Sequence, residues 1–403
     1  MPTIGILGEP TRARIGEDGS VHHPPISMGW WVGADDGWHD PSTDSTARFR
    51  RSGVAPSYEL AVRVPSGDFV QRVYAVASPS GASAVAIDFE NASRAPCSVA
   101  MFIGVTSGRA RLDGPVLVLD GAPVMTFARR PLLWAGGDRQ NVHELVRTGR
   151  AHSGEPPEWK APVEIALLAP VPHKTMLRTA LANESIDIPA LPDPSGVERG
   201  WQHQLDRGMR VELPEELQRQ VDTRRADLLL EQPSASVVAA LEDWGFDSEA
   251  ADAWARLGFR ARRAARRRRE VRGPWHDTPQ YDAFTNPAIL LLAVRQLLVR
   301  ERKDQIDLLP EFRPEWLGQP IAVHELPLRV GTLSFALRWH GARPALLWDA
   351  PAGVTLRAPV LDPTWQGSGG AGEALLAEPP APLLAMGTHA RSGERIEDPG
   401  SFG

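Results

Sequence analysis

The sequence predicts a multidomain α+β protein: an antiparallel β-sandwich, a short layer of α-helices and a small C-terminal β domain. Three stretches of hydrophobic pattern support this order. Apolar and polar residues alternate up to about residue 181, apolar residues recur at helical spacing from about 194 to 303, and the alternation returns after residue 305. We therefore expect a sandwich over residues 1–181, helices over 182–305, a β domain over 306–376 and a flexible tail over 377–403.

The composition is that of a globular protein. The chain has 403 residues, of which 42% are hydrophobic and 23% are charged, and its formal net charge is −6. This charge gives no overall attraction to nucleic acid or to an anionic membrane, so we expect neither as a partner. The single cysteine, Cys97, excludes an intrachain disulfide framework and a multi-thiolate metal site.

The N-terminus and the longest apolar run both predict a cytosolic location. The opening MPTIGILGEP lacks the basic region and the long apolar region of a secretory signal. The longest apolar run, residues 288–294, is far shorter than the roughly 20 residues that cross a bilayer. We expect a cytoplasmic protein.

The β-sandwich is predicted from period-two alternation. In SYELAVRV, the apolar side chains Tyr58, Leu60, Val62 and Val64 point to one face. SAVAIDFENAS and CSVAMFIGV predict two further strands, and the five or so residues between them predict a hairpin connection. A second hairpin is predicted at Asp120 and Gly121, because both residues tolerate the positive φ of a tight turn.

The helical region is predicted from apolar spacing and capping signals. One amphipathic helix carries Leu213, Leu217, Val221 and Leu228, with Pro214 in its first turn. SASVVAALEDWG predicts a shorter helix that Gly245 ends, and Asp247 can cap the next helix. Asn286 and Pro287 then begin a helix that is apolar on nearly all sides, so it should be buried. Four or five helices fit.

The C-terminal β domain is predicted from the return of alternation in Leu333, Phe335, Leu337 and Trp339. HGAR predicts a turn, and ALLWDA leads into another strand. The WQGSGGAGEALL stretch lacks the Lys-Ser/Thr ending of a phosphate loop, so we expect a flexible turn there.

One segment resembles a known superfamily. A helix runs into a leucine-rich segment ending in proline, then a Trp-Leu pair, a strand and a Pro-x-Arg-x-Gly turn before an alternating strand. The residues are Leu308, Leu309, Pro310, Trp316, Leu317, Pro327, Arg329, Gly331, Leu333, Phe335 and Leu337. This pattern resembles the six-hairpin glycosidases, which include glucoamylase-like, glycogen-debranching-like and rhamnosidase-like enzymes. VEIALLAPVPHKTMLRTAL and WQHQLDRGMRVELPEELQRQVDTRRADLLL resemble the end of the family's sandwich and its first toroid helix.

The resemblance implies an N-terminal β-supersandwich followed by an α/α toroid, and an activity on carbohydrates. A full toroid takes twelve helices of about 11 residues each, whereas residues 194–303 number about 110, so the resemblance implies a partial α/α toroid. The family hydrolyses glycosides with two carboxylates from loops between toroid helices, and no acidic residue here aligns with either role. Two interpretations stay open. The chain is a divergent glycosidase-like protein that binds or hydrolyses an α-glucan or another oligosaccharide, or it is a non-catalytic scaffold whose helical layer contacts a second copy or a protein partner.

Two segments combine aromatic rings and acids, the residue types that bind sugars by stacking and by accepting hydroxyl hydrogen bonds. The first contributes the candidates Trp30, Trp31, Asp35, Asp36, Trp38, His39 and Asp40. The second contributes Trp275, His276, Asp277, Tyr281 and Asp282. The alternative interpretation of both segments is a loop whose aromatic residues anchor it to the core.

Other chemistry is less favoured. The basic run FRARRAARRRRE, residues 259–270, is better explained as a solvated helix face or a contact for an acidic partner than as a nucleic-acid site. The acid pairs Glu242 with Asp243 and Asp247 with Glu249 fit helix capping better than catalysis. The histidines fall at no recognised ligand spacing, so we expect no metal and no cofactor. There is also no G-x-S-x-G nucleophile motif.

Overall fold

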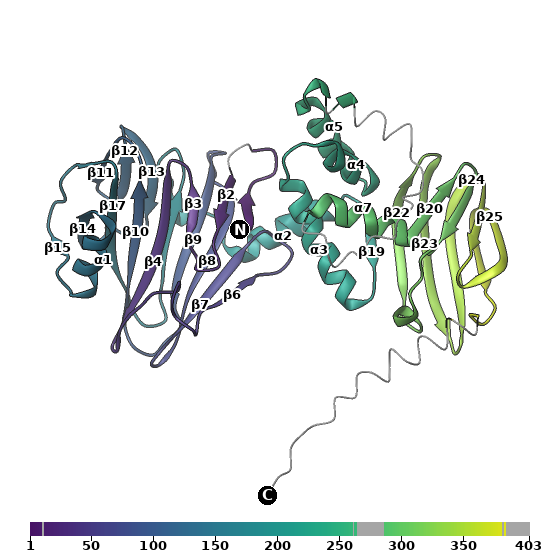
Figure 1. Ribbon diagram of the computed structural model, residues 1–403, viewed down its shortest axis with the longest axis horizontal. Coiled ribbons are helices and arrows are strands. Elements are labelled where there is room, and N and C mark those ends of the chain that lie inside the picture. Colours follow the sequence, from purple (N-terminus) through teal and green to yellow (C-terminus); the bar gives the residue numbers. More distant parts are fainter. Residues whose placement is uncertain (10–11, 261, 264–285, 381–382, 384–403) are drawn as a thin grey trace, which may run out of the picture. The chain divides into compact units, whose positions relative to one another are not determined.

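The computed structural model describes residues 1–403 except 10–11, 261, 264–285, 381–382 and 384–403 (Figure 1). It confirms an α+β protein dominated by strands. The chain divides into two compact units, Met1–Gln202 and His203–Gly403. None of the helices in the described part has the length and hydrophobicity needed to span a membrane. Most of the predicted tail lies outside the described residues.

The first unit contains two nine-stranded antiparallel sheets. The first sheet has the order β1 (Thr3–Gly5), β2 (Arg12–Ile15), β3 (Val21–His23), β4 (Ile26–Ala34), β10 (Cys97–Val105), β17 (Val163–Val171), β14 (Leu133–Gly137) and β15 (His152–Ser153), with β5 (Gly37–His39) paired to β4. The second has the order β16 (Trp159–Lys160), β11 (Arg109–Asp113), β12 (Val116–Leu119), β13 (Ala122–Phe127), β18 (Met176–Leu181), β9 (Ser83–Asn91), β8 (Gly67–Ala77), β7 (Tyr58–Val64) and β6 (Arg48–Arg51).

One hydrophobic core contains side chains from both sheets, as a sandwich requires. The alternating residues Tyr58, Leu60, Val62 and Val64 are all buried in it. Alternate residues of the next two strands, which include Phe89 and Met101, are buried in it as well. The sequence therefore identified the core face of these strands correctly.

The connection between β9 and β10 differs from the prediction. These strands do not form a hairpin, because β9 pairs with β8 and β18 in the second sheet and β10 pairs with β4 and β17 in the first. Both strands are buried on both faces, which is typical of central strands with a neighbour on each side. The buried Asn91 amide donates to the carbonyls of Ala95 and Val171 and so holds the crossover. The Asp120–Gly121 hairpin is confirmed, with φ angles of 49° and 86°.

Short segments cover the outer faces of both sheets. Helix α1 (Arg139–Arg147) begins at Asp138, which caps it, and buries Val142 and Val146 against the first sheet. On the second sheet, the segment before and within η1 (Ile188–Ala190) buries Ile186 and Ile188, and helix α2 (Pro194–Leu205) follows.

Four α-helices lie wholly within the described residues between 215 and 298 of the second unit. They are α3 (Glu215–Leu230), α4 (Ala235–Asp243), α5 (Asp247–Arg256) and α7 (Pro287–Leu298). The Gly245 stop (φ 75°) and the Asn286 cap before Pro287 are as predicted, and the Ser234 side chain caps α4. Asp247 is the first residue of α5 rather than its cap, because Phe246 takes the cap position and Asp247 places its charge in the first turn.

A seven-stranded sheet completes the second unit. Its order is β19 (Arg210–Glu212), β22 (Ile321–Leu328), β23 (Gly331–His340), β24 (Arg343–Ala358), β21 (Gln305–Leu308) and β20 (Val299–Arg302), with β25 (Asp362–Leu375) paired to β24. The WQGSGGAGEALL stretch is therefore part of strand β25 and not a flexible turn. Its backbone makes an antiparallel ladder with β24, which orders the glycines.

The Leu308–Trp339 segment attaches this sheet to α7. The buried Arg295 on α7 donates from Nη2 to Oε1 of Glu301 and to the carbonyl of Pro327, both at 2.7 Å. Glu301 also accepts from the Arg329 backbone N–H at 2.9 Å. Trp316, in η3 (Pro314–Trp316), is fully buried. The Pro-x-Arg-x-Gly turn is thus held by an arginine from helix α7.

Candidate carbohydrate-binding surface

The first predicted segment separates its two adjacent tryptophans. Trp30 is buried between the two sheets, with its ring centroid 5.8 Å from Phe69 and 5.4 Å from Phe89. Trp31 is buried on the opposite face of β4, where its ring meets Phe102 and His143. Neither indole offers an open face, because consecutive residues of a strand point to opposite sides and both sides are covered here.

The rest of this segment forms a small hairpin. Asp35 and Asp36 make the exposed turn between β4 and β5, and Trp38 packs over Gly33. His39 contacts the carboxylates of Asp36 and Asp44. Asp40 accepts hydrogen bonds from the backbone and hydroxyl of Ser42. The structure therefore brings Asp36 and His39 together but places Trp30 and Trp31 elsewhere.

The second predicted segment, with Trp275, His276, Asp277, Tyr281 and Asp282, lies outside the described residues. So does most of the basic run 259–270. Their predicted roles stay predictions.

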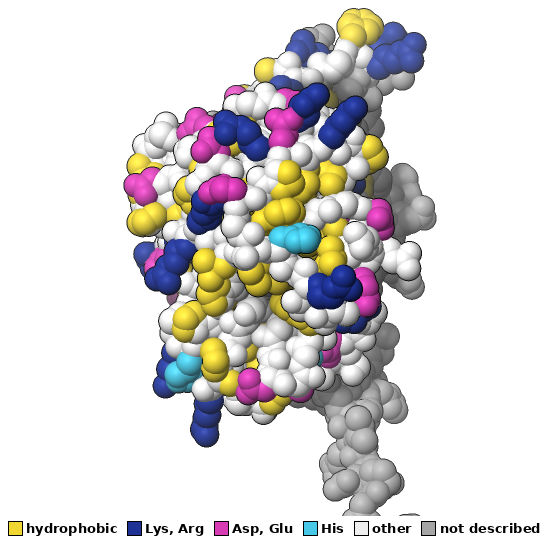
Figure 2. Space-filling view, turned by 90° about the vertical axis from the view of Figure 1, so that its left-hand side faces the viewer, with side chains coloured by type: hydrophobic (Ala, Val, Ile, Leu, Met, Phe, Trp, Pro, Cys, Tyr) yellow, Lys and Arg dark blue, Asp and Glu magenta, His cyan; other side chains and the backbone are white. Residues whose placement is uncertain are grey.

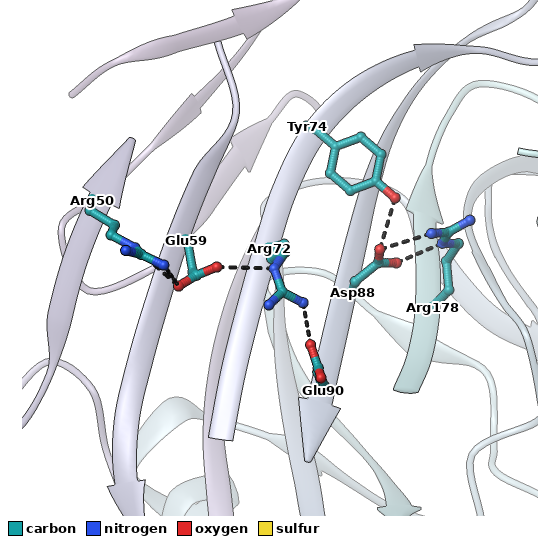
Figure 3. Close-up of polar contacts among 7 residues, drawn as sticks. All are labelled: Arg50, Glu59, Arg72, Tyr74, Asp88, Glu90 and Arg178. Atoms are coloured by element: carbon teal, nitrogen blue, oxygen red, sulfur yellow. Dashed lines mark hydrogen bonds and ion pairs between the residues drawn. The ribbon is translucent and has the colours of Figure 1, made fainter. Parts of the chain in front are cut away.

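The outer face of the second sheet carries a network of carboxylates and arginines (Figure 3). Glu59 accepts from Arg50 at 2.7 Å and from Arg72 at 3.0 Å, and Arg72 also pairs with Glu90. In the adjoining cluster, the fully buried Asp88 accepts two hydrogen bonds from Arg178 and one from Tyr74. Burial, followed by the charge of Asp88, raises the pKa of the Tyr74 phenol.

This network has the character of a structural element. A glycosidase needs one carboxyl group that holds a proton and a second that faces the sugar. Here the oxygens of Glu59 and Asp88 already accept hydrogen bonds from guanidinium groups. The arrangement therefore crosslinks four strands, β6 to β9, together with β18.

A pair of half-buried tryptophans on β24 and β25 forms a different kind of surface. The rings of Trp348 and Trp365 meet edge to face, with centroids 5.3 Å apart and planes at 71°. Glycines make room for both rings. A Cβ atom on Gly367 would lie 2.8 Å from Cζ2 of Trp365, and one on Gly372 would overlap the ring of Trp348. The glycines of β25 therefore leave the space that the two indole rings occupy.

One of the two indole N–H groups is hydrogen bonded, and the other has no acceptor among the described residues. The Trp348 Nε1–H donates to the Ser368 carbonyl at 3.1 Å. Within the described residues, no side chain or backbone oxygen accepts from Nε1 of Trp365. Next to it, the Asp362 carboxylate accepts from the backbone of Ala377 at 2.9 Å and from the Thr364 hydroxyl at 2.7 Å. Burial alone would raise the pKa of Asp362, but these hydrogen bonds lower it and anchor the start of β25.

Two partly open indole faces and an unused N–H donor can bind a sugar ring. Pyranose C–H faces stack on aromatic rings, and hydroxyl oxygens accept from a directed donor. The sequence prediction missed this pair because it assigned residues 365–376 to a turn. The available signal was the group of glycines after Trp365, at 367, 369, 370 and 372, in the strand that pairs with the one carrying Trp348.

Comparisons with known proteins were largely negative. No protein-family model and no curated protein matches the chain. Among solved structures, the chain is similar to a "Putative kojibiose phosphorylase from human microbiome", with a TM-score of 0.33 and 7% sequence identity. The match covers 58% of this chain and 40% of that protein, so the chain spans less than half of its length. A similarity at this level assigns neither a family nor an activity.

Proposed function

We propose that this protein binds oligosaccharides, and that the Trp348–Trp365 pair is the contact surface. The observation that carries the proposal is the half-buried, edge-to-face indole pair, which occupies the space left by the glycines of β25 and has one N–H donor unused. Such a surface is rigid before binding, so little side-chain entropy is lost when a sugar stacks on it.

The proposal includes the architecture that the resemblance implies: a supersandwich, a partial α/α toroid of hairpins and a closing β domain. It is supported by the strand-rich first unit, by the helices between residues 215 and 298 and by the attachment of the Pro-x-Arg-x-Gly turn to α7. Binding is proposed in preference to hydrolysis because the Glu59 and Asp88 carboxylates are occupied by arginines.

The test is calorimetric titration of the full chain with α- and β-linked oligosaccharides, with chromatography of the same samples to detect products. Trp365→Ala and Trp348→Ala should each weaken binding about fivefold or more, since loss of one stacking contact is worth about 1 kcal/mol or more. Trp38→Ala is the matched variant, because Trp38 is also half-buried but belongs to the first predicted segment.

The outcomes separate the alternatives. Binding that survives both changes on β24 and β25 but is lost in Trp38→Ala or Trp275→Ala would move the site to a predicted segment. The absence of binding to every saccharide would refute the proposal. Product release would establish hydrolysis, and the acid would then be sought by changing acidic residues to amides.

A second candidate function is a protein-interaction scaffold. Leu132 and Leu133 are exposed to 63% and 37% beside β14, which is unusual for adjacent leucines. Figure 2 shows hydrophobic side chains forming a band on the side of the sandwich that carries α1 and β14. Leu132→Lys with Leu133→Lys should lower the mass measured by sedimentation if this face joins two copies, whereas Met176→Lys on the other sheet should not. An equal mass in all variants would argue against self-association at this face. The predicted contact at the helical layer stays a separate proposal.

A further inference from the structure

His39 joins two loop segments at the edge of the sandwich. Its Nδ1 lies 2.9 Å from Oδ2 of Asp44, and its Nε2 lies 3.0 Å from Oδ1 of Asp36. A neutral imidazole has one N–H and can donate to only one carboxylate, whereas the imidazolium form can donate to both. The geometry therefore matches the doubly protonated ring.

The contact with Asp44 continues to the second sheet. Oδ1 of Asp44 accepts from the Thr46 backbone at 2.8 Å and from its hydroxyl at 2.7 Å. The same Thr46 hydroxyl oxygen accepts from the backbone N–H of Arg63 on β7 at 3.0 Å. Because β5 belongs to the first sheet and β7 to the second, this chain of hydrogen bonds links the two sheets through one titratable ring.

The two carboxylates that contact the His39 ring differ in exposure and in their other hydrogen bonds. The Asp36 side chain is 48% exposed, and His39 is its partner in the described structure, whereas Asp44 is 14% exposed and is also held by Thr46. Water can replace His39 at Asp36 far more easily than at Asp44. When the His39 ring loses one proton, it should therefore lose its hydrogen bond to Asp36 and keep the one to Asp44.

The surrounding charges are mostly acidic near the ring. Asp35 adjoins Asp36 in the turn, and Asp40 follows His39 in the loop. Beyond Thr46, on the second sheet, Asp68 pairs with Arg48 and Arg63. Of the acidic neighbours, Asp36 and Asp44 favour the protonated ring, and Arg48 and Arg63 are already paired with Asp68.

We propose that His39 is a proton-controlled clasp that fixes the β4–β5 turn to the 40–46 loop, and that loss of its proton frees the turn at Asp36. Partial burial alone would lower the pKa of His39, but its hydrogen bonds with Asp36 and Asp44 and their charges raise it above 6.5. The clasp therefore stabilises the turn fully below that value and is lost as pH rises through the raised pKa. Burial would raise the pKa of the Asp44 carboxyl, but the hydrogen bonds from Thr46 and His39 lower it below 3.8, so the Asp44 contact persists on the acid side.

The experiment is hydrogen exchange of the full chain at about pH 5.5 and about pH 8.5, corrected for the intrinsic pH dependence of exchange, with the pKa of His39 measured by NMR. The amides of residues 35–38 should lose protection at least tenfold at the higher pH. The Asp120–Gly121 turn is the control, because it is a hairpin turn of the same sandwich with no histidine contact.

Two variants make the test specific. His39→Gln should remove the pH difference and leave the turn weakly protected at both values. Asp36→Asn should lower the His39 pKa while leaving Asp44 in contact. A His39 pKa at or below 6.5, or equal protection of the turn at both pH values, would overturn the proposal. This inference is independent of sugar binding.

Discussion

Arg178 on β18 and Asp88 on β9 form a two-pronged ion pair on the outer face of the second sheet. Nε of Arg178 lies 2.6 Å from Oδ1 of Asp88, and Nη2 lies 2.9 Å from Oδ2. The remaining guanidinium nitrogen, Nη1, donates to the Leu191 backbone carbonyl at 3.3 Å. The Tyr74 hydroxyl donates to the Asp88 carboxylate. One guanidinium thus joins two strands to the segment that precedes α2.

Arg178→Ala should destabilise the first unit by about 3 to 5 kcal/mol, because it leaves the buried Asp88 charge without its partner. Urea unfolding measures the change. The double variant Arg178→Met with Asp88→Leu should recover more than half of the loss, since no unpaired charge then remains in the protein interior. If Arg178→Ala were as stable as the parent protein, water would be solvating the Asp88 carboxylate in place of the arginine.

Gly372→Ala should destabilise the β24–β25 ladder by about 1 to 3 kcal/mol, because the added methyl group overlaps the ring of Trp348. Gly29→Ala is the matched control, since Gly29 also lies in a strand and a Cβ there meets nothing within 4 Å. Thermal unfolding measures the loss of stability, and Trp fluorescence measures the change around the Trp348 ring. If both variants behave alike, the glycine does not make room for the indole.

Arg225 should be replaceable by methionine. The buried guanidinium lies 5.8 Å from the Trp244 ring centroid and 5.7 Å from that of Phe246. Its Nη2 donates to the Leu205 carbonyl, and its Nε has no hydrogen-bond partner among the described residues. Burial lowers its pKa, so the charge is held at a cost. We expect Arg225→Met to change stability by less than about 1 kcal/mol and Arg225→Ala to cost about 3 kcal/mol. Equal losses in denaturant unfolding would show that the charge itself is needed.

The Cys97 thiol should be unreactive in the native state. It is buried in the sandwich core, and burial raises its pKa despite the weaker contact with Ser93, so the reactive thiolate is scarce. A disulfide reagent at mildly alkaline pH should modify it only after unfolding, with one thiol per chain. Rapid labelling of the folded protein would contradict this burial.

The sequence predicted local structure well where a residue's neighbours along the chain decide it. Tyr58, Leu60, Val62 and Val64 face the core as predicted, Asp120 and Gly121 make their turn, and Asn286 and Pro287 begin α7. The connection after Asn91 was predicted wrongly, because five residues can close a hairpin or cross between sheets. Only the choice of partner strands distinguishes these two outcomes.

The candidate surface depended on partners that the sequence does not reveal. Trp30 and Trp31 resemble a sugar platform in a linear sequence, yet the sandwich and α1 bury one on each face. Trp365 looked like part of a glycine-rich turn until its strand was paired with the one that carries Trp348. A ring's exposure depends on what packs over it, and alternation alone does not report that.

The sequence by itself determined the α+β class, the faces of the strands and the caps of the helices, because these follow from local sterics and from hydrophobic periodicity. The tertiary structure decided which strands are neighbours, which carboxylates are paired with arginines and which tryptophans remain partly open. Those features arise from contacts between residues far apart in the chain, such as Asp88 with Arg178 and Trp348 with Trp365.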